Sequence, residues 1–230
     1  MSDIHGNLPA LLAVTAALSE MEYDQILVAG DSLGYYSNTS EVLDILASLE
    51  ALVIAGNHER MYFRAQQDES YLAKVTAKYG SSIQGSIERF TAAQLIQVQS
   101  MPEQLNLSTE SGSVCCYHGS PRNCDEYVYP DSNLDGLNDF LPDGTKWVVL
   151  GHTHYPMDRM SDSVRYINPG SVGQPRNSIK KSQWAMLDTK LDSVQFFQQE
   201  YNRDVVIQWA EQTQANLPYL AEVLRDIDSQ

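Results

Sequence analysis

The sequence predicts an α/β fold, and three observations lead to this prediction. The first 57 residues alternate helical and extended patterns, with a short loop after each extended segment. Such alternation is typical of a largely parallel β-sheet covered by helices. Further extended segments follow residue 104. The composition is that of an ordinary globular protein, with 43% hydrophobic and 20% charged residues, and 230 residues suffice to bury a hydrophobic core without disulfides.

The N-terminal part is assigned from its apolar spacing and its helix start signals. Helices are predicted at 8–21 and 40–50, and short buried strands at 25–31 and 51–57. Pro9 stands near the start of the first helix, where its missing N–H costs nothing, and Ser40 is a plausible N-cap of the second. A strand of about five or six residues is also expected ahead of Asp3, and this first strand is missing from the sequence.

The middle of the chain, residues 60–103, is polar and has helical periodicity without a strand pattern. Helices are predicted at about 68–79 and 86–101, the second ending at Pro102. Since no linker or repeat interrupts the chain, we predict a single domain over 1–230 with a helical insert at about 60–103. The insert is expected to cover the core; capping the site, restricting substrate size and forming a dimer contact are the alternatives.

Strand patterns return after the insert. Six strands are predicted, at 105–109, 113–117, 146–150, 163–168, 183–188 and 192–200. The last three are expected to form an antiparallel set joined by turns. A helical tail is predicted over about 203–227.

The charge of the chain excludes some classes of partner. Lys and Arg number 15 against 30 Asp and Glu, which gives a formal charge of −15 and an isoelectric point near 4.5. Because nucleic-acid backbones and anionic membrane surfaces attract basic faces, we expect neither a long nucleic acid nor a membrane as a partner. No stretch approaches the roughly 20 apolar residues of a membrane-spanning helix.

The three cysteines do not form a disulfide framework, because their number is odd and two are adjacent. Cys115 and Cys116 lie in an apolar run and are interpreted as strand residues. The N-terminus has neither a basic region nor an apolar region of a signal peptide. The expected compartment is the cytoplasm.

The positions of the histidines are the strongest functional signal. All five lie in turns beside glycine or directly after an apolar strand, in SDIHGN, GNHER, YHGSP and GHTH; they are His5, His58, His118, His152 and His154. Asp31 follows a third such strand, in AGD, and Asn57 precedes His58. Core or surface histidines would scatter through the helices as well.

This set of residues predicts a site for two metal ions. Imidazole and carboxylate ligands suit Mn, Fe or Zn better than Mg or Ca. Asp3 and His5 are two residues apart, as are His152 and His154, so in extended chain each pair faces one way. Two dications against two carboxylates leave the site locally positive, so a phosphate can dock despite the overall charge.

The segments SDIHGN, GD, GNHE, HGSP and GHTH, in this order, resemble the calcineurin-like metallophosphoesterases. The likeness extends over the chain through NPGSVGQPRN at 168–177 and the strands that follow. The segments HGSPR and NPGSVGQPRN resemble the small prokaryotic branch of the family, which includes phosphodiesterases and dinucleoside tetraphosphate hydrolases. The resemblance implies a four-layer α-β-β-α sandwich of two mixed β-sheets flanked by helices, with the site at the carboxyl-end loops.

The resemblance also assigns roles to residues. One ion would be held by Asp3, His5 and His154, and the other by Asn57, His118 and His152. Asp31 would bridge the two ions, and His58 would donate a proton to the leaving oxygen or stabilise the phosphoryl charge; metal binding by His58 is the alternative. The cofactor would be two divalent ions, Mn by analogy, with Fe, Zn or Ni also fitting. Water activated between the ions would attack phosphorus directly.

Three further residues are candidates for contact with the phosphate. Arg122 and Arg176 each follow a proline, and their guanidinium groups could bind phosphate oxygens in a forked geometry. Ordinary surface arginines are the alternative. Asn7, in HGN, is a third candidate for phosphate contact.

The sequence departs from the family pattern after Asp31. Protein phosphatases of this family place an Asp three residues after GD, to orient the catalytic His. Here that position is Gly34. A Ser/Thr protein phosphatase activity is therefore the less favoured alternative.

The expected partner is a small phosphorylated substrate, and a nucleotide is one candidate. A tyrosine-rich set could line a pocket for a base, although tyrosine is also frequent on ordinary surfaces; it comprises Tyr35, Tyr36, Tyr117, Tyr127 and Tyr129. The sequence is compatible with a homo-oligomer. The alternative from another class is a non-catalytic scaffold that retains the fold. Taken singly, Asp31 and Asn57 are ordinary turn residues, and His118 can be a hydrogen-bonded histidine at a strand end.

Overall fold

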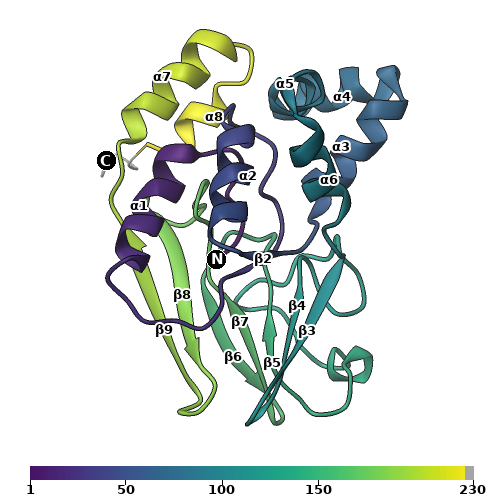
Figure 1. The fold of residues 1–230 in the computed structure, drawn as a ribbon, viewed down its shortest axis with the longest axis vertical. Helices are drawn as coiled ribbons and strands as arrows, with labels where there is room; N and C mark the ends of the chain where they lie inside the picture. The colour runs from purple at the N-terminus through teal and green to yellow at the C-terminus, as the bar shows by residue number, and fades with distance from the viewer. Residues whose placement is uncertain (226–230) are drawn as a thin grey trace.

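The computed structural model describes residues 1–225 and confirms the α/β class. Its helices are α1 (Leu8–Leu18), α2 (Thr39–Ser48), α3 (Asn57–Gln67), α4 (Glu69–Tyr79), α5 (Ser82–Arg89), α6 (Ala92–Gln99), α7 (Arg203–Thr213) and α8 (Tyr219–Glu222). Figure 1 shows α1 and α2 between the α3–α6 group and the α7–α8 pair, with the longer strands extending away from the helices. No helix within residues 1–225 has the length and apolar character needed to cross a bilayer.

Five strands form one mixed sheet in the order β3-β4-β5-β7-β6. These strands are β3 (Gln104–Thr109), β4 (Gly112–Tyr117), β5 (Thr145–Val149), β6 (Met157–Ser161) and β7 (Val164–Asn168). The three central strands run parallel, and β3 and β6 pair antiparallel at the two edges. The parallel strands therefore all end at one edge of the sheet.

The remaining strands are connected through the first residues of the chain. β1 (Leu27–Val28) pairs in parallel with β2 (Leu52–Val53), and β8 (Ser182–Asp188) pairs antiparallel with β9 (Ser193–Gln199). Between these two pairs lies the segment Met1–Asp3. Its backbone bonds 29–30 on one side and 171–173 on the other, and the latter segment bonds β8 in turn. The three residues Met1–Asp3 thus stand in the place where the sequence pattern lacks a first strand.

The strands thus form two sets: β1, β2, β8 and β9 with the segment Met1–Asp3, and the five-stranded sheet. A shared hydrophobic core joins the two sets of strands. It includes Ala29 and Ile54 from one set, with Val114, Cys116, Trp147, Val149 and Ile167 from the five-stranded sheet. Cys115 and Cys116 are both buried in β4, which confirms their interpretation as strand residues.

The outer faces of the two sets of strands are covered differently. Helices α1 and α2 pack over β1, β2 and β8 through a cluster that includes Leu11, Val42 and Trp184. The five-stranded sheet is covered mainly by the irregular segment 121–144, which contributes Val128, Leu134 and Leu137 and contains the 3₁₀ turn η1 (Asn138–Phe140). The outer layer on this side is therefore mostly non-helical.

Helices α3–α6 share a core with α2, because Leu43 of α2 packs in one cluster with Tyr62, Ile83 and Val98. The sequence pattern did not indicate α3. The helix predicted at 86–101 is wrong as a single helix, since α5 and α6 are separated at Phe90. Thr91 begins α6 as an N-cap, and its side chain accepts a hydrogen bond from the Gln94 N–H.

The predicted tail helix over 203–227 is also interrupted. Helix α7 ends at Thr213, and Pro218 is the N-cap of α8. Residues 226–227 of that prediction lie outside the described residues.

Two strand predictions need correction. The antiparallel set expected for the last three strands is wrong: of these three, β8 and β9 pair with each other, whereas β7 lies between β5 and β6 in the five-stranded sheet. Strand β6 was not predicted. Its sequence, MDRMS, is largely polar, and only Met157 is fully buried, so the apolar pattern of a strand is weak.

Candidate metal centre

The predicted site residues follow the carboxyl ends of strands in both sets. Asp31 follows β1, Asn57 begins α3 just after β2, His118 follows β4, and the GHTH segment 151–154 follows β5. Residues 3–5 follow the strand-like N-terminal segment. The two sets of strands therefore bring these residues to a common edge.

Five of these residues adopt a left-handed backbone conformation, which side chains other than glycine rarely tolerate. The φ angles are 53° at Asp3, 54° at His5, 54° at Asp31, 67° at His152 and 63° at His154. Each such residue costs on the order of 1–3 kcal/mol, and the strain persists only where surrounding contacts hold it. Strained backbone of this kind is commonly concentrated at active sites and ligand-binding sites.

The first group of candidate ligands consists of Asp3, His5 and His154, all buried. The Nε2 atom of His154 lies 3.3 Å from Asp3 Oδ1 and 3.2 Å from His5 Nε2. The same carboxylate accepts hydrogen bonds from the His152 backbone N–H and from the Ser2 hydroxyl. These contacts orient the carboxylate toward the two imidazoles.

The second group contains Asp31, His118 and His152. The Nε2 atom of His118 lies 3.3 Å from Asp31 Oδ2, 3.0 Å from His152 Nδ1 and 2.9 Å from Asn57 Oδ1. Asp31 Oδ2 also lies 3.8 Å from His5 Nε2. Asp31 is therefore between the two groups.

The imidazole rings are oriented by backbone carbonyl groups. The Nδ1 atoms of three rings lie next to carbonyl oxygens: His5 at 2.9 Å from Leu33, His118 at 2.8 Å from Ala29, and His154 at 2.6 Å from Gln174. An Nδ1–H that donates to a carbonyl leaves Nε2 to present its lone pair to a metal ion.

The donor set fits divalent metal ions. Imidazole nitrogens approach one another to 3.2 and 3.0 Å beside two carboxylates, and a cation between them would satisfy the converging lone pairs. A third compatible group consists of His5, Asp31 and His58. These three groups offer imidazole nitrogens and carboxylate oxygens as ligands, and none of them contains a cysteine.

Burial and charge act in opposite directions on these groups. Burial disfavours the charged form of Asp31, but His118 holds the pKa of this carboxyl well below its usual range. Burial also disfavours the charged form of Asp3, but the neighbouring His154 lowers the pKa of that carboxyl below its usual range. Burial likewise disfavours the charged form of His118, but Asp31 raises its pKa to about 10, so a metal ion at Nε2 would replace a proton there. Burial lowers the pKa of His152 to about 4. The two carboxylates thus stay charged at neutral pH and attract cations.

His58, the second residue of α3, is 2% exposed and faces Asp31. Its backbone N–H donates to Asp31 Oδ1 at 2.9 Å, and its Nε2 lies 4.0 Å from Asp31 Oδ2. Within residues 1–225, its Nδ1 atom is buried without a hydrogen-bond partner. A Cβ atom added to Gly34 would lie 1.9 Å from this nitrogen, so there is no room for a side chain at position 34.

Glu59, the next residue of α3, is a functional residue that the sequence analysis left without a role. It is fully buried and accepts backbone N–H bonds from Asp31, Ser32, Leu33 and Gly56. Burial and the Asp31 carboxylate raise its pKa to about 7, whereas the N–H donors favour its charged form. Glu59 thereby fixes the loop that carries Asp31 to the start of α3. Its place in GNHE was the available signal.

The structure separates the two arginines predicted to bind phosphate. The Arg176 guanidinium donates to the Tyr35 hydroxyl at 3.1 Å, and the Tyr35 ring packs 4.5 Å from the His5 ring. Arg122 instead binds both carboxylate oxygens of Glu126. Within residues 1–225, Arg176 makes no ion pair, so its charge is available near the histidines.

Asn7 is buried and has a structural role. Its Oδ1 caps α1 by accepting the Ala10 N–H, and its Nδ2 donates to Gly173 O and Tyr201 Oη. These contacts engage both polar atoms of the side chain.

Tyrosine side chains surround the histidine cluster. Of the predicted set, Tyr35 and Tyr127 contact the cluster and Tyr129 stacks on Tyr127, whereas Tyr36 and Tyr117 are buried in other cores. Tyr79 also contacts His58, with ring centroids 5.3 Å apart. Tyr79 was not predicted because it lies in a helix rather than in a motif turn.

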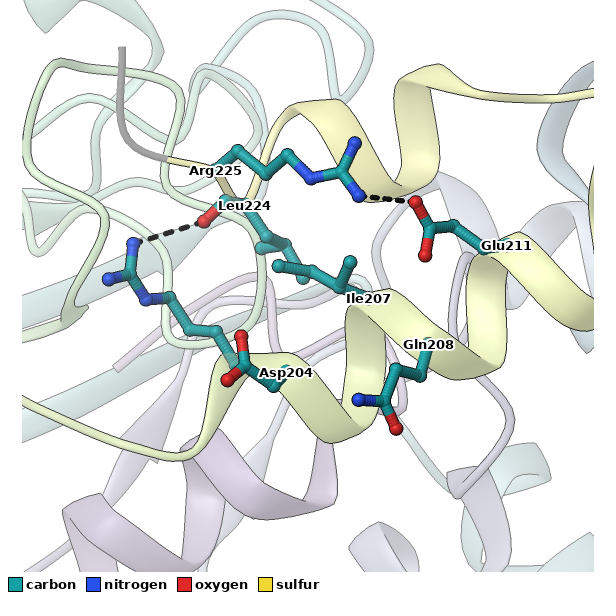
Figure 2. A pocket seen from close by; sticks show the side chains of 7 residues that line it. Asp204, Ile207, Gln208, Glu211, Leu224 and Arg225 are labelled. Atoms are coloured by element: carbon teal, nitrogen blue, oxygen red, sulfur yellow. Dashed lines mark hydrogen bonds and ion pairs between the residues drawn. The ribbon is translucent and has the colours of Figure 1, made fainter. Parts of the chain in front are cut away.

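Two pockets occur elsewhere on the protein. Figure 2 shows one of about 310 Å³ between α7 and the residues after α8, where Arg225 pairs with Glu211. The second, of about 370 Å³, is lined by residues from 133–139 and 159–162. Neither contains a residue of the histidine cluster.

Comparison with known proteins finds matches along most of the chain. The family model described as a calcineurin-like phosphoesterase superfamily domain matches residues 1–192. An uncharacterized protein of Methanocaldococcus jannaschii is 27% identical over 225 residues, which cover 88% of this chain and 86% of that protein.

Two solved structures are similar over nearly the whole chain. A hypothetical protein from Pyrococcus horikoshii has a TM-score of 0.81 at 20% identity, with 98% of this chain and 96% of that one covered. A metallophosphoesterase from Sphaerobacter thermophilus has a TM-score of 0.76 at 24% identity, with 97% and 98% covered. These likenesses show the fold.

Proposed function

Because the chain belongs to the calcineurin-like phosphoesterase superfamily, we propose that it hydrolyses a phosphodiester or phosphoanhydride with the help of two divalent metal ions. The observation that carries this proposal is the position of Asp31. One of its oxygens lies within 4 Å of histidines from both ligand groups, His118 and His5. A carboxylate in this position suits a bridge between two ions.

The residues divide into two sets around Asp31. We assign one ion to Asp3, His5 and His154, and the other to Asn57, His118 and His152. The ions would lower the pKa of water and stabilise charge on the phosphoryl oxygens. Manganese suits this mixture of imidazole, carboxylate and amide donors, as do iron and zinc.

The other residues bind and orient the substrate. His58 is held beside Asp31 and offers its ring N–H to the leaving oxygen, which stabilises developing charge there. Arg176 provides a guanidinium for phosphate oxygens. The buried Tyr35 ring and the partly buried Tyr79 ring pack against His58 and reduce the access of water to it.

Two alternatives are less well supported. A protein phosphatase activity would call for a carboxylate partner of His58, and the space at Gly34 does not admit one. A scaffold has no need for strained, converging ligands, which all remain present here. The cytoplasmic location and a homo-oligomeric state stay predictions.

The test is Mn²⁺-dependent hydrolysis of diadenosine tetraphosphate and of bis(p-nitrophenyl) phosphate, with products separated by chromatography. We expect hydrolysis of at least one substrate, and loss of turnover in Asp31→Asn and His58→Ala. Full activity in either variant would refute the assigned roles. No hydrolysis of either substrate at any of the Mn²⁺, Fe²⁺ or Zn²⁺ concentrations tested would favour the scaffold.

A further inference from the structure

His152 is the least buried histidine of the cluster. Among the five histidines, His152 has the largest exposed fraction, 6%, whereas His5 and His118 are completely buried. The ring nearest to His152 is that of Tyr127, with centroids 4.0 Å apart. The His5 and His58 rings pack against Tyr35, which is itself buried. Of the three tyrosines that contact these histidines, Tyr35, Tyr79 and Tyr127, the exposed one is Tyr127.

Tyr127 and Tyr129 form an exposed aromatic surface beside His152. Their rings are nearly parallel, with an interplanar angle of 10° and centroids 5.9 Å apart. The exposed fractions are 49% for Tyr127 and 39% for Tyr129, high values for large aromatic residues. Tyr155 packs edge-on against Tyr129, and its hydroxyl donates to the Arg176 backbone oxygen. The aromatic surface thus runs from a candidate metal ligand to the segment of the candidate phosphate-binding arginine.

We propose that Tyr127 and Tyr129 stack on a planar aromatic ring of the substrate, which makes the substrate a nucleoside phosphate. This inference rests on the proposed phosphoesterase function, because it places the phosphate at the histidines. Exposed tyrosine rings gain free energy by stacking on a base, and any of the four bases satisfies this contact. The charge of −15 disfavours long polyanions, so the substrate carries one or a few nucleotides.

A ring in this position has a structural alternative. Tyr127 packs on His152 and can serve only to shield and hold that imidazole. In that case its removal would disturb binding of every phosphate ligand equally. Stacking on a base, by contrast, changes affinity only for ligands that carry a base.

The experiment compares the affinities of AMP and ribose 5-phosphate for the Mn²⁺-loaded protein by calorimetry. We expect AMP to bind about 5- to 150-fold more tightly than ribose 5-phosphate, the range of one stacked base. Tyr127→Leu should remove most of this preference and leave ribose 5-phosphate binding unchanged. Tyr127→Phe, which keeps the ring, should retain it. Tyr23→Leu, at a tyrosine that is 43% exposed in the loop before β1, should leave both affinities unchanged.

Two results would overturn the inference. One is equal affinity for the two ligands in the unaltered protein, including no measurable binding of either. The other is an equal loss of both affinities in Tyr127→Leu, which would assign the ring to support of His152. Failure of the proposed function appears separately, as absent hydrolysis by the unaltered protein.

Discussion

Gly34 and His58 depend on each other, because the backbone conformation at position 34 and the space beside the His58 ring both require glycine there. Gly34 has a φ of +92°, which favours glycine, and its Cα faces the His58 ring. The absence of a Cβ lets His58 approach Asp31 closely. The residue that departs from the family pattern in the sequence is therefore the one that makes room for the catalytic candidate.

Gly34→Ala should lower kcat by about 100-fold, because the added Cβ displaces His58 and removes its contribution to proton transfer. Metal affinity should fall less than kcat, since His58 is not assigned to either ion. Steady-state kinetics and metal titration measure the two effects. Gly144→Ala is the matched control: Gly144 also has a positive φ, +81°, but a Cβ there meets no atom within 4 Å. Equal kcat losses in both variants would contradict the role of position 34.

The two arginines also give opposite expectations. Arg176→Ala should lower kcat/KM by about 10- to 100-fold, because a charge-assisted hydrogen bond to phosphate is lost. Arg122→Ala should change it less than about 2-fold, since Glu126 already pairs with that guanidinium. If Arg122→Ala had the larger effect, the assignment of the phosphate contact would be reversed.

Single residues were predictable from sequence where they stand in glycine-flanked turns. His5, His118 and His154 lie in such turns, and the structure brings them together with Asp3 and Asp31. Glu59 was given no role although it stands in the GNHE segment, and Tyr79 was missed because it lies inside a helix, where no motif marks it. Their contact with the cluster arises only from the way α3 and α4 pack.

At the scale of elements, the connection between β1 and α3 depends on one buried carboxylate. Glu59→Gln should destabilise the protein by about 2–6 kcal/mol, because the amide NH₂ would face backbone N–H groups that lose their acceptor. Urea unfolding measures the change. Glu88→Gln, at an exposed position in α5, should stay within about 0.5 kcal/mol. A small effect of Glu59→Gln would mean that water replaces the carboxylate.

Element boundaries were predicted less well than element types. The break between α5 and α6 has a local signal, the Thr91 cap with Gln94, which periodicity alone does not detect. Strand β6 has no comparable signal, because its residues at the sheet edge are mostly polar. The pairing of β7 with β5 is set by packing between distant segments, which a local pattern does not contain.

At the scale of the whole molecule, the candidate ligands come from both sets of strands. Asp31 and Asn57 follow β1 and β2, whereas His118 and His152 follow strands of the five-stranded sheet. The α/β class was predictable because helix and strand alternate locally. The joining of β1 and β8 through Met1–Asp3 was not, since it depends on partners more than 100 residues away.

A metal ion bound between the two sets of strands should stabilise the fold. At Mn²⁺ concentrations 100-fold above the dissociation constant, each site should add about 2.7 kcal/mol to the free energy of unfolding. Thermal unfolding with Mn²⁺ and with EDTA measures this gain. Asp31→Asn should lose most of it, while Asp24→Asn, at an exposed position, should keep it. An identical melting temperature with Mn²⁺ and EDTA would argue against ions at this interface.

The position of Met1–Asp3 between distant segments has a consequence for protein synthesis. The backbone oxygen of Asp3 accepts the Ser171 hydroxyl, 168 positions away, and its carboxylate accepts the His152 N–H, 149 positions away. On the ribosome, Asp3 is made before Ser171 by roughly 8–34 s, at about 5–20 residues per second. The nascent chain therefore carries both carboxylates of the candidate metal site, Asp3 and Asp31, before His118, His152 and His154 have been made.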